Sequence, residues 1–272
     1  MHRTGFASDQ SDSDASCESE KHRMETLRRL RLLDTAAEVS FDNLVEMASE
    51  VCDTPIALVS LTDVDRQWFK ANRGLPDVQQ IPRSRSFCNT AISQQELHML
   101  EVCDTLQDER FACNPLVTNA PHIRFYAGQP IVASNGAPLG TLCVIDRTPR
   151  RLTEHQRQML KLLAKQVESE IELRRLTDTV LQQRDFTDVL LGAALPSHII
   201  DQLRSGQSLP IAAQHKEASV LFLDLVGFTQ LASSVAAATL VGVLSQVFGA
   251  FDRISAHCGL LKIKTLGDGY MG

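Results

Sequence analysis

One long helical segment divides this sequence and limits how the rest can fold. From Glu154 to about Leu191 the chain has neither Gly nor Pro, the residues that most often interrupt a helix. Within it Leu173, Leu176 and Val180 have the three-then-four spacing of a coiled-coil seam, which polar residues interrupt before Leu190 restores it. We expect this helix to connect two domains and to pair with its copy in a second chain, in a register that can shift. The alternative is a helix that lies on its own domain.

Composition excludes several classes of protein. Of the 272 residues 43% are hydrophobic and 22% charged, which supports a folded core and rules out a wholly disordered or fibrous chain. The net charge of -6 and the lack of a Lys/Arg-rich run argue against a nucleic-acid partner. The sequence shows no apolar run of the roughly 18 residues that a membrane span needs, and no export signal at its start. We therefore expect a cytoplasmic protein without a membrane span.

The cysteines are scattered, with no CxxC pair and no Cys/His cluster at zinc spacing. An odd number of them in a cytoplasmic chain is typical of buried small hydrophobes and free thiols, with a redox or metal role as the alternative. The seven are Cys17, Cys52, Cys88, Cys103, Cys113, Cys143 and Cys258.

Residues 1–24 are acidic and serine-rich, with almost no apolar side chains. Such a segment buries too little surface to offset the entropy of ordering, so we predict a disordered tail. A solubilising tail is the favoured interpretation, and phosphorylation of its serines is the alternative.

Between residues 25 and 173 helix and strand patterns alternate. Phe41, Leu44, Val45 and Val51 recur at helical spacing, and Asn135-Gly136 between apolar runs predicts a hairpin. Short runs rich in β-formers predict the strands 56–61, 67–70, 97–102, 125–133 and 139–145.

Seven segments of this block occur in an order typical of one family: 56–61, 66–70, 86–92, 108–111, 114–117, 123–128 and 139–146. Over residues 25–173 they resemble a GAF domain of the bacterial signalling type. The resemblance implies an α/β sandwich with an antiparallel sheet that senses a small ligand or a redox state. It also implies dimerisation through flanking helices, so residues 174–217 are expected to form a signalling helix and linker.

The ligand of this domain stays unknown at the level of sequence. Arg124, Tyr126 and Asp108 could face a pocket, although such an Arg more often pairs with a carboxylate and such a Tyr more often packs. We expect Cys88 and Cys143 to be core residues, with a thiol sensor as the alternative.

The segment 219–229 predicts a buried strand with Asp224 at its middle. A buried carboxylate needs a cation, a metal, hydrogen-bond donors or a proton. Gly227 allows a tight turn, and a helix follows, so the amides of residues 226–229 are expected at a helix N-terminus, where phosphates bind.

A second carboxylate lies at the tip of a predicted hairpin in 262–271, where Gly267 and Gly269 flank Asp268. Carboxylates on adjoining strands beside a helix N-terminus would suit Mg²⁺ held against a triphosphate. The alternative is a capped turn and a satisfied core Asp.

Residues 221–229 and 262–271, separated by a helix predicted from Leu231 to about His257, resemble the start of the class III adenylate/guanylate cyclase catalytic domain. The resemblance implies a ferredoxin-like α/β domain in an α+β protein. It also implies attack of a ribose 3′-hydroxyl on the α-phosphate with release of pyrophosphate, using two Mg²⁺ or Mn²⁺ ions. By the resemblance the metal ligands are Asp224, Asp268 and the Leu225 carbonyl.

The same resemblance assigns the substrate contacts. The amides of Gly227, Phe228 and Thr229 would hold the β- and γ-phosphates, and Lys264 occupies a position that reads the purine. Members that use ATP tend to have Lys there, whereas guanylate cyclases tend to have Glu, so ATP is the expected substrate and cAMP the product.

Only residues 218–272 belong to this second domain, and the Asn and Arg that the family uses in the transition state would follow Gly272. We therefore expect a fragment of a homodimeric, GAF-regulated lyase in signal transduction, inactive as this chain alone. The alternative is a GAF ligand-binding or dimerisation protein with an inert cyclase remnant.

Overall fold

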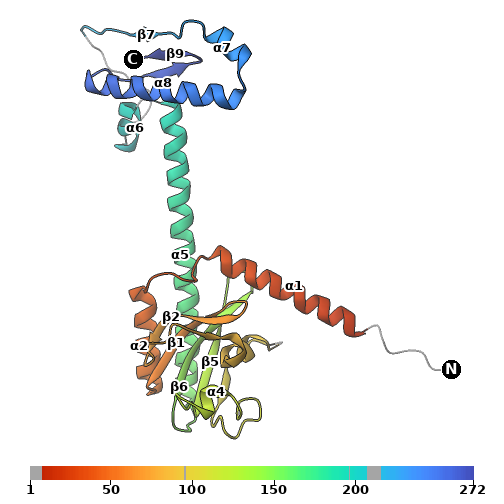
Figure 1. Ribbon diagram of the computed structural model, residues 1–272. Coiled ribbons are helices and arrows are strands. Elements are labelled where there is room, and N and C mark those ends of the chain that lie inside the picture. Colours follow the sequence, from red (N-terminus) through yellow and green to blue (C-terminus); the bar gives the residue numbers. More distant parts are fainter. Residues whose placement is uncertain (1–7, 95, 196, 207–215) are drawn as a thin grey trace, which may run out of the picture. The chain divides into compact units, whose positions relative to one another are not determined.

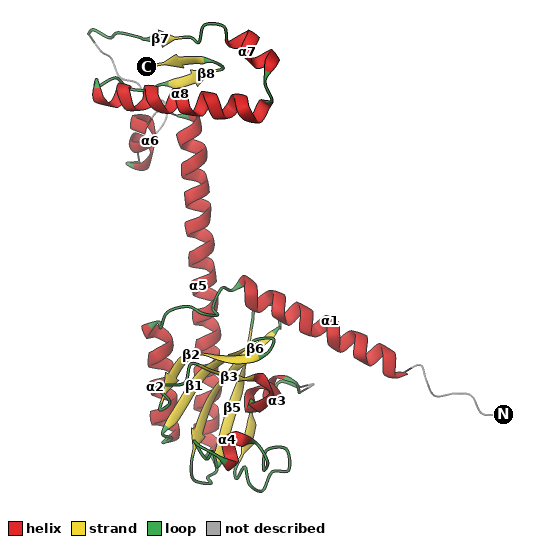
Figure 2. Cartoon of the chain, viewed as in Figure 1, coloured by secondary structure: helices red, strands yellow, loops and turns green. Residues whose placement is uncertain are grey.

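The computed structural model describes residues 8–94, 96–195, 197–206 and 216–272. The chain divides into two compact units, Met1–Asp178 and Thr179–Gly272, which are described separately. Figure 1 follows the elements along the chain, and Figure 2 shows which segments are helix or strand.

The first unit is built on a six-stranded antiparallel sheet of order β3-β2-β1-β6-β5-β4. Its strands are β1 (Ile56–Thr62), β2 (Arg66–Arg73), β3 (Gln80–Pro82), β4 (Leu100–Val102), β5 (Phe125–Val132) and β6 (Pro138–Asp146). β5 and β6 form the hairpin that Asn135-Gly136 predicts, with Gly136 at φ 86°. The strand expected at 97–102 is shortened to β4. The edge strand β3 was not predicted.

The two faces of this sheet carry separate hydrophobic clusters. On one face α2 (Val39–Cys52) and the start of α5 (Glu154–Ala194) pack with alternate strand residues, and Phe41, Leu142 and Leu160 are fully buried there. On the other face lie α3 (Phe87–Ile92), the short turn Arg83–Arg85 and α4 (Pro115–Thr118), around Phe87 and Tyr126. The period of two along each strand supplies both clusters, because successive side chains point to opposite faces.

The prediction of a disordered tail over residues 1–24 is wrong for the part that the structure describes. Helix α1 runs from Ser8 to Arg29. Met24, the last residue of the predicted tail, is buried in the hydrophobic cluster that includes α2, and Leu27, three residues further on, is buried there too. The end of the tail therefore does bury apolar surface.

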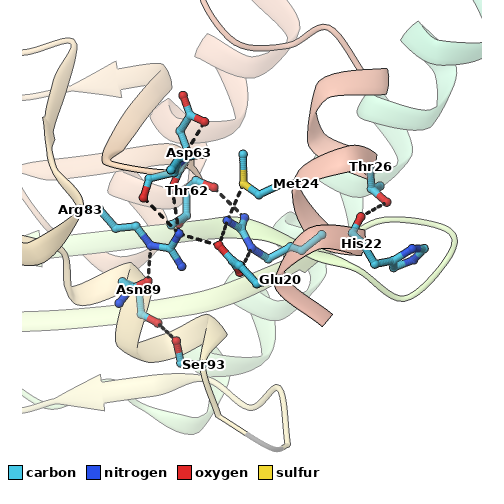
Figure 3. A network of polar contacts seen from close by, with 11 residues as sticks. Glu20, His22, Met24, Thr26, Thr62, Asp63, Arg83, Asn89 and Ser93 are labelled. Carbon is cyan, nitrogen blue, oxygen red and sulfur yellow. Dashed lines mark hydrogen bonds and ion pairs between the residues drawn. The ribbon is translucent and has the colours of Figure 1, made fainter. Parts of the chain in front are cut away.

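Ion pairs complete the attachment of α1 (Figure 3). Arg23 is 3% exposed and donates from Nη1 to the Thr62 carbonyl at 2.6 Å. Glu20 accepts from Arg23 Nε at 2.7 Å and from Arg83 Nη1 at 2.6 Å. Hydrogen bonding to Arg23, then to Arg83, outweighs desolvation and lowers the pKa of Glu20 to about 2.

The second unit holds the end of α5, α6 (Ser197–Arg204), α7 (Phe228–Ser234), α8 (Ala237–His257) and a small antiparallel sheet. The sheet order is β7-β9-β8, with β7 at Phe222–Leu223, β8 at Lys264–Leu266 and β9 at Gly269–Met271. The single helix expected from Leu231 to about His257 is two helices, because Val235 and Ala236 are extended.

The buried strand expected at 219–229 is also wrong. Only Phe222 and Leu223 are in a strand, and Phe222 is 65% exposed. Among the described residues β7 has a neighbour on one side only, which is β9. Asp224 is therefore exposed and does not need the compensating partner that a buried carboxylate would.

Helix α8 bears on the expectation that no segment could span a membrane. Of the described helices it alone is long and apolar enough to cross a membrane, judged by length and composition, with a mean hydropathy of 1.2. The core helix of a soluble protein passes the same test but is mostly buried, whereas none of the apolar window of α8 is buried. α8 also carries Asp252, which is paired with Lys262.

Candidate functional site

Strand pairing in the second unit sets the positions of both predicted carboxylates. Leu223 pairs with Tyr270, and Asp224 follows Leu223 at the end of β7. Asp268 is the second residue of the two-residue turn between β8 and β9, where Leu266 pairs with Gly269. The hairpin expected around Asp268 is thus confirmed, and its second strand, β9, pairs with β7, the strand that Asp224 follows.

Two glycines shape the turn that carries Asp268. Gly267 has a φ of 62°, the left-handed conformation that a tight turn requires and that side chains disfavour. A Cβ added to Gly269 would lie 3.1 Å from the Leu266 carbonyl oxygen and 3.5 Å from the Leu223 carbonyl oxygen. The first distance is tight, so a side chain here would press on the turn itself, whereas the second is an ordinary contact with β7.

The predicted phosphate loop lies at the start of α7. Gly227, at φ 80°, is the N-cap residue, and its carbonyl accepts from Leu231 N at 3.1 Å. Residues 226–229 thus stand at a helix N-terminus, as expected. The Leu225 carbonyl accepts from Phe228 N at 3.3 Å, which leaves one of its two lone pairs for another partner.

Lys264 lies on β8, the strand on the other side of β9 from β7, and is opposite Met271. Its side chain is exposed, as is that of Asp224, whereas Asp268 is half-buried. In the described part of the chain no three His, Cys, Asp or Glu side chains cluster as a metal site would require. The donor set on hand is two carboxylates and a backbone carbonyl, hard oxygen ligands of the kind that Mg²⁺ and Mn²⁺ prefer.

A polar cluster that the sequence did not predict anchors β9 to α8. Tyr270 is 1% exposed and donates from its hydroxyl to Asp252 Oδ1 at 3.0 Å, with Ser255 Oγ at 3.1 Å. Asp252 Oδ2 accepts from Lys262 Nζ at 2.8 Å. The Tyr270 ring also contacts Phe248 and Phe251. This cluster supports the strand next to both predicted metal ligands, and a Tyr two residues after Asp268 was its only sequence signal.

The GAF candidates have mostly structural roles. Arg124 donates to Asp104 at 3.0 and 2.9 Å, as expected of an Arg paired with a carboxylate. Asp108 accepts from Arg110, the closest contact being 2.6 Å. Tyr126 is buried and stacks on Phe87, with ring centroids 5.1 Å apart.

Cys88 and Cys143 are core residues, as expected, and they belong to a polar cluster under α3. Ser60 Oγ and Tyr126 Oη each donate to Cys88 Sγ at 3.2 Å. Desolvation alone would raise the pKa of Cys88, but hydrogen bonds from Cys143, Ser60, Thr141 and Tyr126 lower it to about 6. Hydrogen bonding to Cys88, together with burial, raises the pKa of Cys143 well above its usual value.

Beside this cluster lies a cavity of about 170 Å³ between the sheet and the segments around α3 and α4. Leu58, Phe69, Phe87, Tyr126 and Ile145 contribute to its lining. Arg124 and Asp108 are not among the side chains that line it, so neither is the ligand contact that their sequence positions allowed.

Sequence comparisons agree with this arrangement of two units. Residues 37–171 match the GAF domain, and residues 211–272 match the adenylate and guanylate cyclase catalytic domain. The chain thus contains a GAF domain followed by part of a nucleotide cyclase catalytic domain, within an α+β fold.

Individual relatives match parts of this chain. A cyclic di-GMP phosphodiesterase of Pseudomonas aeruginosa is 42% identical over 60% of this chain, and an adenylate cyclase of Mycobacterium tuberculosis is 45% identical over 33%. The alignments span 27% and 20% of those proteins, so the chain covers a minor part of either. The GAF domain of an Acinetobacter phosphoenolpyruvate-protein phosphotransferase superposes with a TM-score of 0.42 at 20% identity, over 56% of this chain and 93% of that one.

Proposed function

We propose that this chain is the sensor and the metal-binding part of a GAF-regulated adenylate cyclase that acts in the cytoplasm. The observation that carries the proposal is the register of the second sheet. Asp224 directly follows Leu223, which pairs with Tyr270, and Asp268 lies in the turn that begins β9, in a segment that matches a cyclase domain; this supports a shared site next to the start of α7.

In this proposal Asp224, Asp268 and the Leu225 carbonyl hold two Mg²⁺ or Mn²⁺ ions. Such ions neutralise phosphate charge and favour the ionised form of the attacking 3′-hydroxyl. The amides of Gly227, Phe228 and Thr229 bind the β- and γ-phosphates of the leaving pyrophosphate. Asp224, Gly227 and Thr229 are exposed and Asp268 is half-buried, which leaves the site open to a nucleotide and to a second catalytic domain that would supply the remaining groups.

The choice of ATP rests on Lys264. An ammonium group donates to adenine N1 but has nothing to accept from the N1–H of guanine, for which a carboxylate would be suited. Lys264 is exposed on the strand beyond β9, so its side chain is open to a base bound near the carboxylates.

Pairing of two chains through α5 is the proposed path of regulation. Leu173, Leu176, Val180 and Leu190 of its predicted seam are 47% to 61% exposed in the single chain. A partner helix would cover them, and a change of register would then reach the cyclase segment.

The test is cyclase activity of the gene product isolated from its own cells, whose intact mass is measured first. With Mn²⁺ or Mg²⁺ we expect cAMP from ATP, little cGMP from GTP, and no activity from the 272-residue chain alone. The variant Lys264→Glu should move the preference toward GTP, whereas Lys216→Glu, an exposed control, should not. A gene product that converts neither nucleotide would favour the alternative, a GAF binding module with an inert remnant.

A further inference from the structure

The cavity in the GAF domain is almost wholly apolar. Among the described side chains that line it there is no Lys, Arg, His, Asp or Glu. Phe69, Phe87 and Tyr126 bring aromatic rings to its wall, with Phe87 stacked on both Tyr126 and Phe111. A nucleotide or a carboxylate would lose its hydration there without a counter-charge, so the site suits an uncharged apolar molecule.

One polar atom at the cavity has no partner. Gln67 lines the cavity and is 2% exposed, and its Oε1 is buried without a hydrogen bond among the described residues. The side chain lies on β2 and points to the same face as Phe69, two residues on. An amide oxygen left in this state costs free energy that a donor on a ligand would recover.

The other polar groups at the wall are already engaged. Tyr126 Oη donates to Cys88 Sγ, and Cys88 also accepts from Ser60. Thr62, opposite Gln67 in the register of β1 and β2, has a buried hydroxyl that likewise lacks a partner among the described residues, but it does not line the cavity. The acceptor presented to a ligand is therefore Gln67.

The volume of the cavity limits how large the ligand can be. An apolar cavity of about 150 Å³ can stay dry and bind benzene, and the cavity here is about 170 Å³. We propose that it binds a small uncharged aromatic molecule whose single N–H or O–H group donates to Gln67 Oε1. This rests on the proposed role of the GAF domain as the sensor, but it concerns binding alone and is tested without cyclase activity.

The experiment uses two probes that differ only in the donor. Indole carries an N–H where indene has a CH₂ group. Ligand-observed NMR titrations of the 272-residue chain measure both affinities, in the wild type and in Gln67→Met, which keeps the length of the side chain. We expect the preference for indole over indene to fall about tenfold in Gln67→Met, the loss of one buried hydrogen bond. Gln79→Met, at an exposed glutamine, should leave the preference unchanged.

Other outcomes overturn the proposal. If neither probe binds, the cavity is not a ligand site. An unchanged preference in Gln67→Met would mean that the amide is satisfied within the protein, with Thr62 as the candidate partner. Should Gln67→Met fail to fold, Leu116→Trp decides instead: a ring placed in the cavity must abolish binding of both probes, and persistent binding would locate them elsewhere.

Discussion

The two units differ most in how deeply their characteristic residues are buried. In the first unit the family-like segments supply fully buried side chains on both faces of the sheet, such as Leu142 and Tyr126. In the second unit the described hydrophobic side chains that count as buried are Tyr270, at 1% exposed, and Ile200, at 8%, while Phe222 and Leu266 are more than half exposed. A segment can therefore match a family's motifs while most of its described side chains stay outside a hydrophobic core. Pattern alone does not predict burial.

The largest effect is expected from the two carboxylates proposed as metal ligands in the second unit. Asp224→Asn and Asp268→Asn should each lower cyclase activity of the gene product about a thousandfold, because each removes a charged metal ligand worth several kcal/mol in the transition state. Titration of Mn²⁺, followed by electron paramagnetic resonance of the free ion, should show weaker binding in both variants. Glu217→Gln removes a charge from an exposed side chain nearby in sequence and serves as the control. Equal loss of activity in that control would remove the special role of the two aspartates.

The comparison of cores makes a second prediction, on stability. Phe41→Ala removes a fully buried ring from the first unit and should lower its free energy of unfolding by about 3–5 kcal/mol. Phe222→Ala, at a side chain 65% exposed, should change stability by less than about 0.5 kcal/mol. Urea unfolding would be followed by fluorescence of Trp68, the only Trp, which belongs to the same cluster as Phe41, and by circular dichroism. A cost of several kcal/mol for Phe222→Ala would break the comparison, since β7 would then be covered by a surface outside the described residues.

The sequence predicted most of the first fold because its signals are local. β-former runs and the Asn135-Gly136 turn predicted the β5–β6 hairpin and its neighbours. It did not predict helix α1, since an acidic segment becomes ordered here only through distant partners such as Thr62 and Arg83. Nor did it predict the break before α8, where no Gly or Pro marks the extended residues.

The candidate site, too, was predictable where its signals are local and not where it depends on distant contacts. The sequence showed a hairpin tip at Asp268 and a strand that includes Asp224. The antiparallel pairing of β7 with β9 then brings both to the same end of the small sheet. The exposure of Asp224 could not be recognised, because it depends on which strands flank β7. The orphaned amide of Gln67 was also out of reach, since a lost hydrogen bond depends on contacts made in three dimensions.

A third prediction applies the same substitution to each unit. Tyr270→Phe removes the donor to Asp252 and should destabilise the second unit by about 1–2 kcal/mol, because a carboxylate loses a buried partner. Tyr126→Phe removes the weaker donor to Cys88 in the first unit and should cost about 1 kcal/mol or less. The Trp68 signal should shift only for Tyr126→Phe. A shift of that signal in Tyr270→Phe would show that the two units unfold together.

The smallest effect concerns the ion pairs that attach α1 to the well-packed unit. The pKa of Glu20 is lowered to about 2 in the folded protein, first by Arg23 and then by Arg83, from an ordinary value of 4.5. A carboxyl with a lowered pKa stabilises the folded state fully above the unfolded value, and this contribution is lost as the pH falls from 4.5 toward 2. Because the Glu20 side chain is 41% exposed, solvent screening should hold the contribution below about 1 kcal/mol.

Glu20→Gln should therefore lower the urea midpoint slightly at pH 7, and the difference from the wild type should shrink between pH 4.5 and 2. Glu18→Gln, two residues earlier at an exposed position, should show no such trend. If the difference between Glu20→Gln and the wild type stays constant with pH, the attachment of α1 depends on Met24 and Leu27 rather than on charge.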